Sequence, residues 1–420
     1  MLDPQYLEYM RVKRAVVLAI LAIAVMLSAS SSQAIGLSGQ LTSDFYITDE
    51  NGLSHIRPYE RLQANLLAWQ GTGGRSLAFH SYLRWTGDWA DRKLVDPETY
   101  VYDAYLKLIG VPKGTALFLG RQFVYNGVGS ALLDGLRLKY RIDRRFQVDL
   151  FGGSGVSQLH PDKVQSPADF AVLGGRLSSQ PNSSIRLGLN WMLRRSEGFT
   201  VSHRVGLDGD ITVKHLQLYS RVAYDVASLS PAALLLRTSY SLSRWYWSGE
   251  FDWREPSVSS NSIFSLIDAR RYREARAEVQ RTVWRRLAVV GQLQVGFFTA
   301  DRSWRTGIGV RSDNFSVGWR HQTGYGGDHD GLYGFANLPL TKHWECFATA
   351  DAGRYRVQEE QDGRSDAYAG GLGLLWRSGH GLAARVDGQY LRNAVQSRDL
   401  RINLRVSQDF SLGERAGNGI

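Results

Sequence analysis

Apolar and polar side chains alternate along almost the whole chain, and this pattern restricts the possible folds more than any other feature. Near the C-terminus, Ile402, Leu404 and Val406 alternate with polar residues that include Arg401 and Arg405. Successive side chains of a β-strand point to opposite faces, so such a segment has one apolar and one polar face. The same alternation recurs in runs separated by turn-forming residues, which predicts an all-β protein.

The number of alternating runs predicts one large closed sheet. From residue 35 to residue 410 short turns alternate with longer polar gaps, and no change of composition marks a second domain. A soluble β-sandwich seldom extends one core over so long a chain, whereas an apolar barrel face needs only lipid. We therefore expect a single antiparallel up-and-down transmembrane β-barrel over 35–410 with an even number of strands from 16 to 22, followed by a C-terminal tail over 411–420.

The N-terminus has the features of an export signal. Basic residues precede the apolar stretch Ala15–Leu27, and small residues lead up to Ala34. This stretch is shorter than the roughly 20 apolar residues of a membrane-spanning helix, which favours a signal peptide over an anchor. We expect residues 1–34 to be cleaved, and the polar lead before Met10 leaves either Met1 or Met10 as the start.

The composition fits an exported barrel. The chain has 44 Gly, 20 Tyr, 16 Phe and 12 Trp, and its one cysteine, Cys346, excludes an intramolecular disulfide. Outer-membrane barrels place many aromatic rings at the two lipid–water boundaries. These features predict the outer membrane of a Gram-negative bacterium, with the bilayer and lipopolysaccharide as surroundings. Phe410, which closes the last amphipathic strand, is the predicted signal for the barrel-assembly machinery.

One segment is more specific than the alternation. Residues 117–140 contain Gly120-Arg121-Gln122, then Tyr125 and Gly127, then Asp134-Gly135. This segment resembles the alginate-export and related porin families, which implies an outer-membrane channel. Tyr125, Gly127 and Asp134 are the candidates for a loop that constricts the lumen. For Arg121 two roles remain open, namely contact with a solute or an ion pair with Asp134 that holds an inward-folded loop.

The polar faces of the predicted strands carry many cations, and the formal net charge is +10. A guanidinium in a water-filled pore keeps its charge and attracts anions. We expect an anion-selective lumen, although nearby acids offer a purely structural role to each single cation. The predicted lumen residues are Arg121, Arg137, Lys139, Arg141, Arg186, Arg194, Arg221, Arg305, Arg311, Arg320, Arg385, Arg401 and Arg405.

The expected function is passive passage of small anionic solutes or acidic saccharides. The alternative is a barrel with a plugged lumen that acts as an outer-membrane enzyme or attaches or assembles surface polysaccharide. No sequence motif of a hydrolase, a metalloenzyme or a nucleotide-binding protein is present, so we predict no catalytic residue, cofactor, metal or nucleic-acid partner. Asp328 and Asp330 lie in a glycine-rich stretch, a pattern far more typical of loops than of cation sites.

Overall fold

The protein is described from a computed structural model. The structure describes residues 36–50, 53–87, 98–157, 163–255, 272–298, 301–356, 363–394 and 397–413. The predicted signal peptide therefore lies outside the described residues. Among the described residues there is no helix long and apolar enough to cross a membrane.

The described residues form 22 strands and one short 3-10 helix. The first eleven strands are β1 (Gly36–Glu50), β2 (Leu53–Gln70), β3 (Ser76–Thr86), β4 (Glu98–Ile109), β5 (Thr115–Asn126), β6 (Gly129–Arg141), β7 (Phe146–Gly155), β8 (Phe170–Asn182), β9 (Ile185–Ser196), β10 (Phe199–Val213) and β11 (Leu216–Asp225). The others are β12 (Ser230–Leu242), β13 (Trp245–Arg254), β14 (Tyr272–Trp284), β15 (Leu287–Phe297), β16 (Arg302–Arg311), β17 (Phe315–Gly324), β18 (Asp328–Pro339), β19 (Trp344–Arg356), β20 (Ser365–Arg377), β21 (Leu382–Arg392) and β22 (Asp399–Leu412). The 3-10 helix η1 (Thr72–Gly74) connects β2 to β3.

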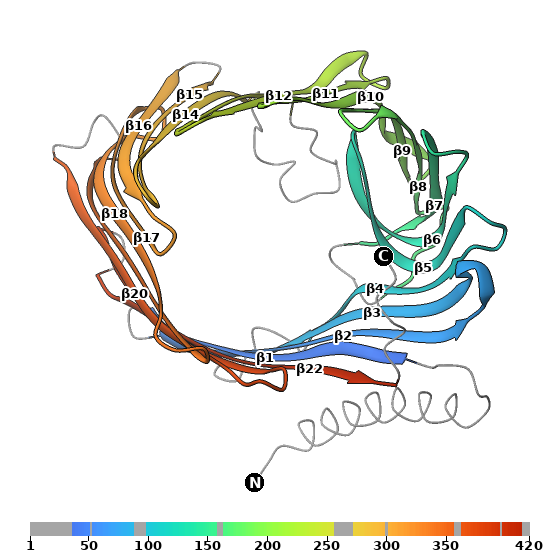
Figure 1. Ribbon diagram of the computed structural model, residues 1–420, viewed down its shortest axis with the longest axis horizontal. Helices are drawn as coiled ribbons and strands as arrows, with labels where there is room; N and C mark the ends of the chain where they lie inside the picture. The colour runs from blue at the N-terminus through green and yellow to red at the C-terminus, as the bar shows by residue number, and fades with distance from the viewer. Residues whose placement is uncertain are drawn as a thin grey trace, which may run out of the picture.

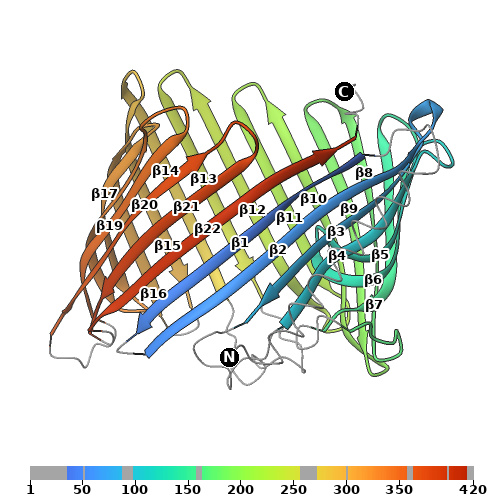
Figure 2. The same ribbon diagram turned by 90° about the horizontal axis from the view of Figure 1, so that it is seen from below.

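Every strand pairs with its neighbours in the chain, and the sheet closes on itself. The pairing is antiparallel throughout, and β1 pairs with β22 from Leu37 opposite Leu412 to Glu50 opposite Asp399. Figure 1 looks down the resulting ring, and Figure 2 shows the tilted strands side by side with β22 next to β1. The prediction of a closed antiparallel barrel is confirmed, and its strand number is the upper limit of the predicted range. Strand β22 runs to Leu412, just beyond the predicted barrel end at 410, so Phe410 lies within it.

Short turns lie at one end of the barrel and longer connections at the other. The start of β1 and the end of β22 meet at the end that also carries the tight turns over 142–145, 183–184 and 312–314. The opposite end also includes a tight turn between β9 and β10, in which Glu197 and Gly198 both have positive φ, 50° and 82°. Two successive residues of this kind form the turn that best matches the twist of an antiparallel hairpin. The same end carries the longer segments between β3 and β4, β7 and β8, and β13 and β14.

The outer face of the barrel is apolar. Leucines with exposed side chains recur at alternate positions of neighbouring strands, among them Leu119, Leu136, Leu150, Leu189, Leu207, Leu293, Leu332 and Leu372. The positions between these leucines on the same strands are polar or face another part of the chain. The alternation in the sequence therefore corresponds to an apolar outer surface and an inner surface that bounds the lumen.

Candidate functional site

The hairpin of β5 and β6 leaves the barrel wall and folds inward. Strand β4 pairs with β5 only as far as Ala104 opposite Arg121, and β7 pairs with β6 only from Leu133 onward. Between these points β5 and β6 pair with each other alone. We call residues 122–132 the inner hairpin. Figure 1 shows this teal ribbon inside the ring, next to the wall formed by β7–β10.

Gly120 allows the chain to turn away from the wall. Its φ of 124° is a conformation that side chains rarely adopt, and a Cβ atom there would lie 2.3 Å from the carbonyl oxygen of Ala104. Only glycine has access to this backbone region without strain and permits so close an approach. Position 120 thus marks where β5 separates from β4.

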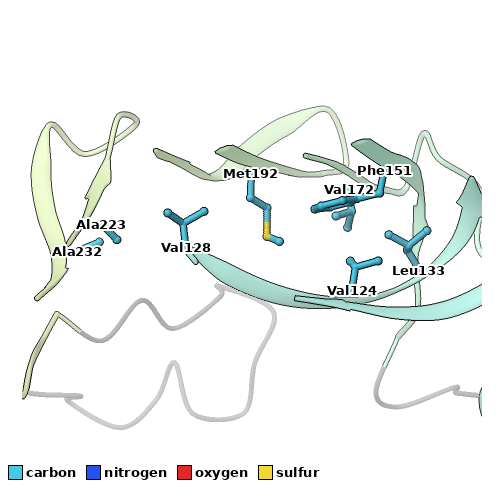
Figure 3. Packing of buried hydrophobic residues seen from close by; sticks show 8 residues of the cluster. All are labelled: Val124, Val128, Leu133, Phe151, Val172, Met192, Ala223 and Ala232. Atoms are coloured by element: carbon cyan, nitrogen blue, oxygen red, sulfur yellow. The ribbon is translucent and has the colours of Figure 1, made fainter. Parts of the chain in front are cut away.

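Apolar side chains fix the inner hairpin to the wall. Val124 and Val128 of the hairpin, with Leu133 at its base, form one buried cluster with side chains of β7, β8, β9, β11 and β12, namely Phe151, Val172, Met192, Ala223 and Ala232. Val124, Leu133 and Val172 are 0% exposed. Figure 3 shows Val124 and Met192 pointing toward each other across the space between hairpin and wall. Each such buried side chain contributes about 1.5–3 kcal/mol, so the hairpin is held in place.

Hydrogen bonds also hold the inner hairpin against the wall. The buried side-chain amide of Asn126 donates a hydrogen bond to the carbonyl of Trp191 (2.8 Å), and the backbone N–H of Gly127 donates to Oδ1 of Asn190 (3.0 Å). Asn190 in turn donates to Asp208 (2.5 Å). Arg194 of β9 donates to the carbonyl of Ser130 on the returning strand of the hairpin. The tip is therefore bonded to the wall on both of its strands.

Arg121 and Asp134 hold the base of the hairpin. They lie opposite each other on β5 and β6, and the guanidinium donates to both carboxylate oxygens at 2.8 and 2.7 Å. Arg121 is 5% exposed and also donates to the carbonyls of Val101 (3.4 Å) and Lys163 (2.9 Å). Of the two roles left open by the sequence, this geometry matches the ion pair that holds an inward-folded loop.

The opposite side of the inner hairpin faces the lumen. Phe123 and Tyr125 are 56% and 51% exposed, and the hydroxyl of Tyr125 accepts a hydrogen bond from Arg221 at 2.7 Å. A cavity of about 460 Å³ lies between the tip and the wall of β10–β14, lined by Gly127, Arg204, Arg221, Arg254 and Tyr272 among others. The constriction candidates Tyr125 and Gly127 thus lie together at this cavity, whereas Asp134 lies at the base of the hairpin.

Several of the predicted lumen cations are neutralised by a neighbouring acid. The pairs are Arg137 with Asp149 (2.6 Å), Arg311 with Glu278 (3.7 Å), Arg385 with Asp387 (2.7 Å), Arg401 with Asp399 and Arg405 with Asp44. An arginine paired in this way adds no net charge to the lumen. Arg137 and Asp149 lie on neighbouring strands, as do Arg405 and Asp44, so these two pairs also connect adjacent strands of the wall.

Other predicted cations have no carboxylate within ion-pair distance among the described residues: Lys139, Arg141, Arg186, Arg194, Arg221, Arg305 and Arg320. Arg305 donates to the amide oxygen of Gln322 at 2.7 and 3.0 Å, and the guanidinium of Arg320 lies 5.0 Å from the ring centroid of Tyr333. Arg141 and Arg186 line a depression of about 430 Å³ beside the turn over 142–145.

Other inward residues were not identified from the sequence. Arg176 pairs with Asp208 (2.6 Å), and Arg204 pairs with Asp225 (3.4 Å), both close to the inner hairpin. They follow the same alternation as the predicted residues, so the periodicity was sufficient to find them. Asp328 and Asp330 are paired with Arg356 and Arg364, each at 2.7 Å.

The barrel is wide compared with the hairpin. A strand spacing of about 4.8 Å and a tilt of about 40° give a barrel of this strand number a backbone diameter of roughly 40 Å. A β-layer packed on another occupies about 10 Å of that width. Within the described residues, the inner hairpin therefore narrows one side of the lumen and leaves the wall of β14–β18 uncovered.

Comparisons with known proteins yield similarity of fold only. No protein-family model matches the sequence, and no curated protein matches it. Among solved structures, Pseudomonas aeruginosa OpdQ is 9% identical with a TM-score of 0.46, covering 90% of this chain and 99% of that chain. Acinetobacter baumannii OccAB4 is 8% identical with a TM-score of 0.43, covering 91% and 99%. Pseudomonas aeruginosa OpdK in a structure with vanillate is 8% identical with a TM-score of 0.42, covering 90% and 99%.

Proposed function

We propose that this protein is an outer-membrane channel of a Gram-negative bacterium through which small anionic solutes, including acidic saccharides, pass down their gradients. One observation carries this proposal. A hairpin fixed inside the barrel narrows the lumen, and its open side faces arginines such as Arg221 that have no carboxylate partner among the described residues.

The outer face supports a position in a lipid bilayer. The rings of Trp245 and Trp247 stack with centroids 5.7 Å apart, and Trp344 and Trp376 lie 6.4 Å apart. Both pairs lie near the strand ends beside the short turns, where the apolar outer face gives way to polar residues. Indole rings are most stable at such a lipid–water boundary. Cleavage after Ala34, recognition of Phe410 by the assembly machinery, and contact with lipopolysaccharide are parts of the same proposal.

The balance of inward charge determines the sign of the selectivity. Paired cations contribute little to the electric field in the pore. The negative charge of the neighbouring carboxylate cancels their field at distances larger than the separation of the two charges. The cations without an acidic partner, including Arg194, Arg221, Arg305 and Arg320, set the local potential. Anions then enter at raised concentration, and the resemblance of residues 117–140 to alginate-export proteins extends this expectation to acidic saccharides.

Reversal-potential measurements test the proposed function. Purified protein in a planar bilayer under a potassium chloride gradient should conduct with a preference for chloride. Replacing Arg221, Arg305 and Arg320 together by Gln should shift the reversal potential toward that of potassium, because lumen substitutions tune selectivity without unfolding the barrel.

A matched control removes a neutral pair. Arg237 and Glu250 form an ion pair on the inner face of β12 and β13 at 2.6 Å, so changing both to Gln leaves the net charge unaltered. This double variant should retain the reversal potential of the parent protein. Absence of conductance, or conductance with no preference for anions, would overturn the proposed function.

A further inference from the structure

Tyrosines from four adjacent strands surround one arginine on the inner face of the barrel. The group contains Tyr46 of β1, Tyr59 of β2, Tyr82 and Arg84 of β3, and Tyr100 and Tyr102 of β4. We call these residues the tyrosine cluster. They lie toward the end of the barrel that carries the longer connections, since Tyr59 pairs with Thr86 at the end of β3 and Arg84 pairs with Tyr100 near the start of β4.

The rings are packed against one another and against the guanidinium. Tyr82 and Tyr102 are stacked with centroids 5.0 Å apart, Tyr100 and Tyr102 are stacked at 6.2 Å, and Tyr46 meets Tyr59 edge-on at 5.2 Å. The Cζ atom of Arg84 lies 4.3 Å from the ring centroid of Tyr100, 5.3 Å from that of Tyr102 and 5.8 Å from that of Tyr59. Such packing makes the cluster a preformed surface with few freely rotating side chains.

The strand register places the cluster on the inner face. Arg61 lies two residues after Tyr59 on β2, so the two side chains point to the same face. Arg61 forms an ion pair with Asp44, which also binds Arg405 of β22. These charged residues lie on the polar side of the wall, whereas Leu41 and Leu106 on the intervening positions are exposed on the apolar side. The tyrosines share the face of Arg61 and therefore face the lumen.

Arg84 differs from the neighbouring Arg61 in that it has no ion pair within the described part of the chain. Arg61 has a carboxylate partner in Asp44, whereas the side chain of Arg84 forms no ion pair among the described residues; the Nε atoms of both arginines are buried without a hydrogen-bond partner. Stacking on a ring uses the face of a guanidinium and leaves its N–H edge available for a carboxylate.

We infer that the tyrosine cluster is a binding subsite for acidic saccharides, with Arg84 binding the carboxylate and the tyrosines contacting the sugar ring. The aromatic faces match the apolar C–H face of a pyranose, and the phenol hydroxyls match its ring hydroxyls. A carboxylate accepts two parallel hydrogen bonds from a guanidinium, which fixes the orientation of the sugar. This inference rests on the proposed function, because it names the solute class and where in the lumen it binds.

Further inward rings extend from the cluster toward the inner hairpin. His80 lies two residues before Tyr82 on the same face of β3. The centroid of its ring lies 5.0 Å from that of Tyr105, which lies 5.7 Å from that of Phe118. Lys107 and Lys139 both lie 5.7 Å from the ring centroid of Phe118. Asp103, opposite Tyr82, accepts a hydrogen bond from the backbone N–H of Phe123 in the inner hairpin at 3.2 Å. The subsite is thus connected along the wall to the constriction.

Block of single-channel current by oligogalacturonate tests the inference. The acidic oligosaccharide should interrupt the current of the parent protein, and Arg84→Gln should shorten the dwell time about tenfold or more, the usual loss for a charge-assisted hydrogen bond. Arg237→Gln is the matched control, because it makes the same change of charge on the inner face of β12, outside the cluster. It should leave the dwell time nearly unchanged. Equal effects of the two variants would show attraction by overall charge and overturn the subsite.

Two further comparisons identify the chemistry recognised. Tyr102→Leu should shorten the dwell time while Tyr102→Phe largely preserves it, because stacking needs only the ring. A neutral malto-oligosaccharide should block only briefly. Benzoate carries the carboxylate without a sugar ring, so a block by benzoate as long as that by oligogalacturonate would overturn the assignment to saccharides.

The outcomes separate this inference from the proposed function. Anion-selective conductance without any block by oligogalacturonate overturns the subsite alone. Absence of conductance overturns the proposed function, and calorimetric titration of the detergent-solubilised full chain with oligogalacturonate then still tests binding, with Arg84→Gln as its negative control.

Discussion

The two sides of the lumen are built differently. The inner faces of β7–β12 carry apolar side chains such as Val172 and Met192 that are covered by the inner hairpin. The inner faces of β13–β17 carry polar side chains such as Glu250, Gln292 and Arg305, which line an uncovered depression of about 550 Å³. The same barrel therefore has one wall that is packed like a protein core and one that is solvated.

This difference explains where the simple alternation fails. On the uncovered side, inward positions meet water and are polar, as the sequence rule requires. On the covered side, inward positions meet the hairpin, and burial of apolar surface favours Val, Met and Ala there. An apolar residue on the inner face thus indicates that another segment of the chain covers it. The predictions below test this distinction, in order of decreasing effect.

The largest effect is expected at the base of the hairpin. Arg121→Ala leaves the partly buried carboxylate of Asp134, 13% exposed, without its partner, and breaking a buried pair typically costs about 3–5 kcal/mol. The variant should lose its heat-modifiable gel mobility at a markedly lower temperature than the parent protein. Arg237→Ala removes an exposed ion pair on the uncovered wall and should cost less than about 1 kcal/mol. Equal losses in the two variants would contradict the role given to Arg121.

The next effect concerns the docking of the hairpin. Val124→Glu places a charge in the apolar cluster, where an unpaired ionised group is strongly unfavourable, so the hairpin should separate from the wall. Single-channel conductance should then rise and become noisier. Phe123→Glu changes the adjacent residue, which faces the lumen, and should leave the hairpin docked while weakening the preference for anions. If Val124→Glu conducts like the parent protein, the cluster does not hold the hairpin.

A smaller effect separates the outer face from the inner face. Leu372 is 68% exposed on the apolar side of β20 near the middle of the strand, and an arginine at the bilayer midplane costs about 2–4 kcal/mol. Leu372→Arg should therefore lower the yield of folded barrel in lipid vesicles. Gln389→Arg, on the inner face of the adjacent β21, should fold normally and slightly increase the preference for anions. The opposite ranking would mean that the two faces are assigned incorrectly.

The sequence predicted the closed barrel because alternation depends only on which face each residue occupies. It also placed Arg137, Arg305 and Arg405 on the polar face. In the structure these three arginines contact Asp149, Gln322 and Asp44, respectively. Which of these cations would be neutralised was not predictable, because Asp44 meets Arg405 only through the closure between β1 and β22.

The tyrosine cluster illustrates the same limit. Tyr82 and Arg84 stand at alternate positions in the sequence, so their shared face was predictable. Tyr100 and Tyr102 also stand at alternate positions, but the register between β3 and β4 shifts at Tyr82 and Leu83. An irregularity of this kind changes which residues lie opposite each other and is not visible in a hydrophobic pattern. The contact between the two pairs therefore required the structure.

Cross-linking of the inner hairpin to the wall tests the central claim most directly. A Cβ atom at Gly129 would lie 3.1 Å from the sulfur of Met192, so cysteines at these two positions, in a Cys346→Ser background, lie within reach of a short bifunctional thiol reagent. We expect this pair to cross-link in membranes without loss of conductance, and Gly129→Cys combined with Gln292→Cys on the uncovered wall to remain unlinked. Failure of the first pair to cross-link, or cross-linking of the second, would contradict a hairpin docked on one side of the lumen.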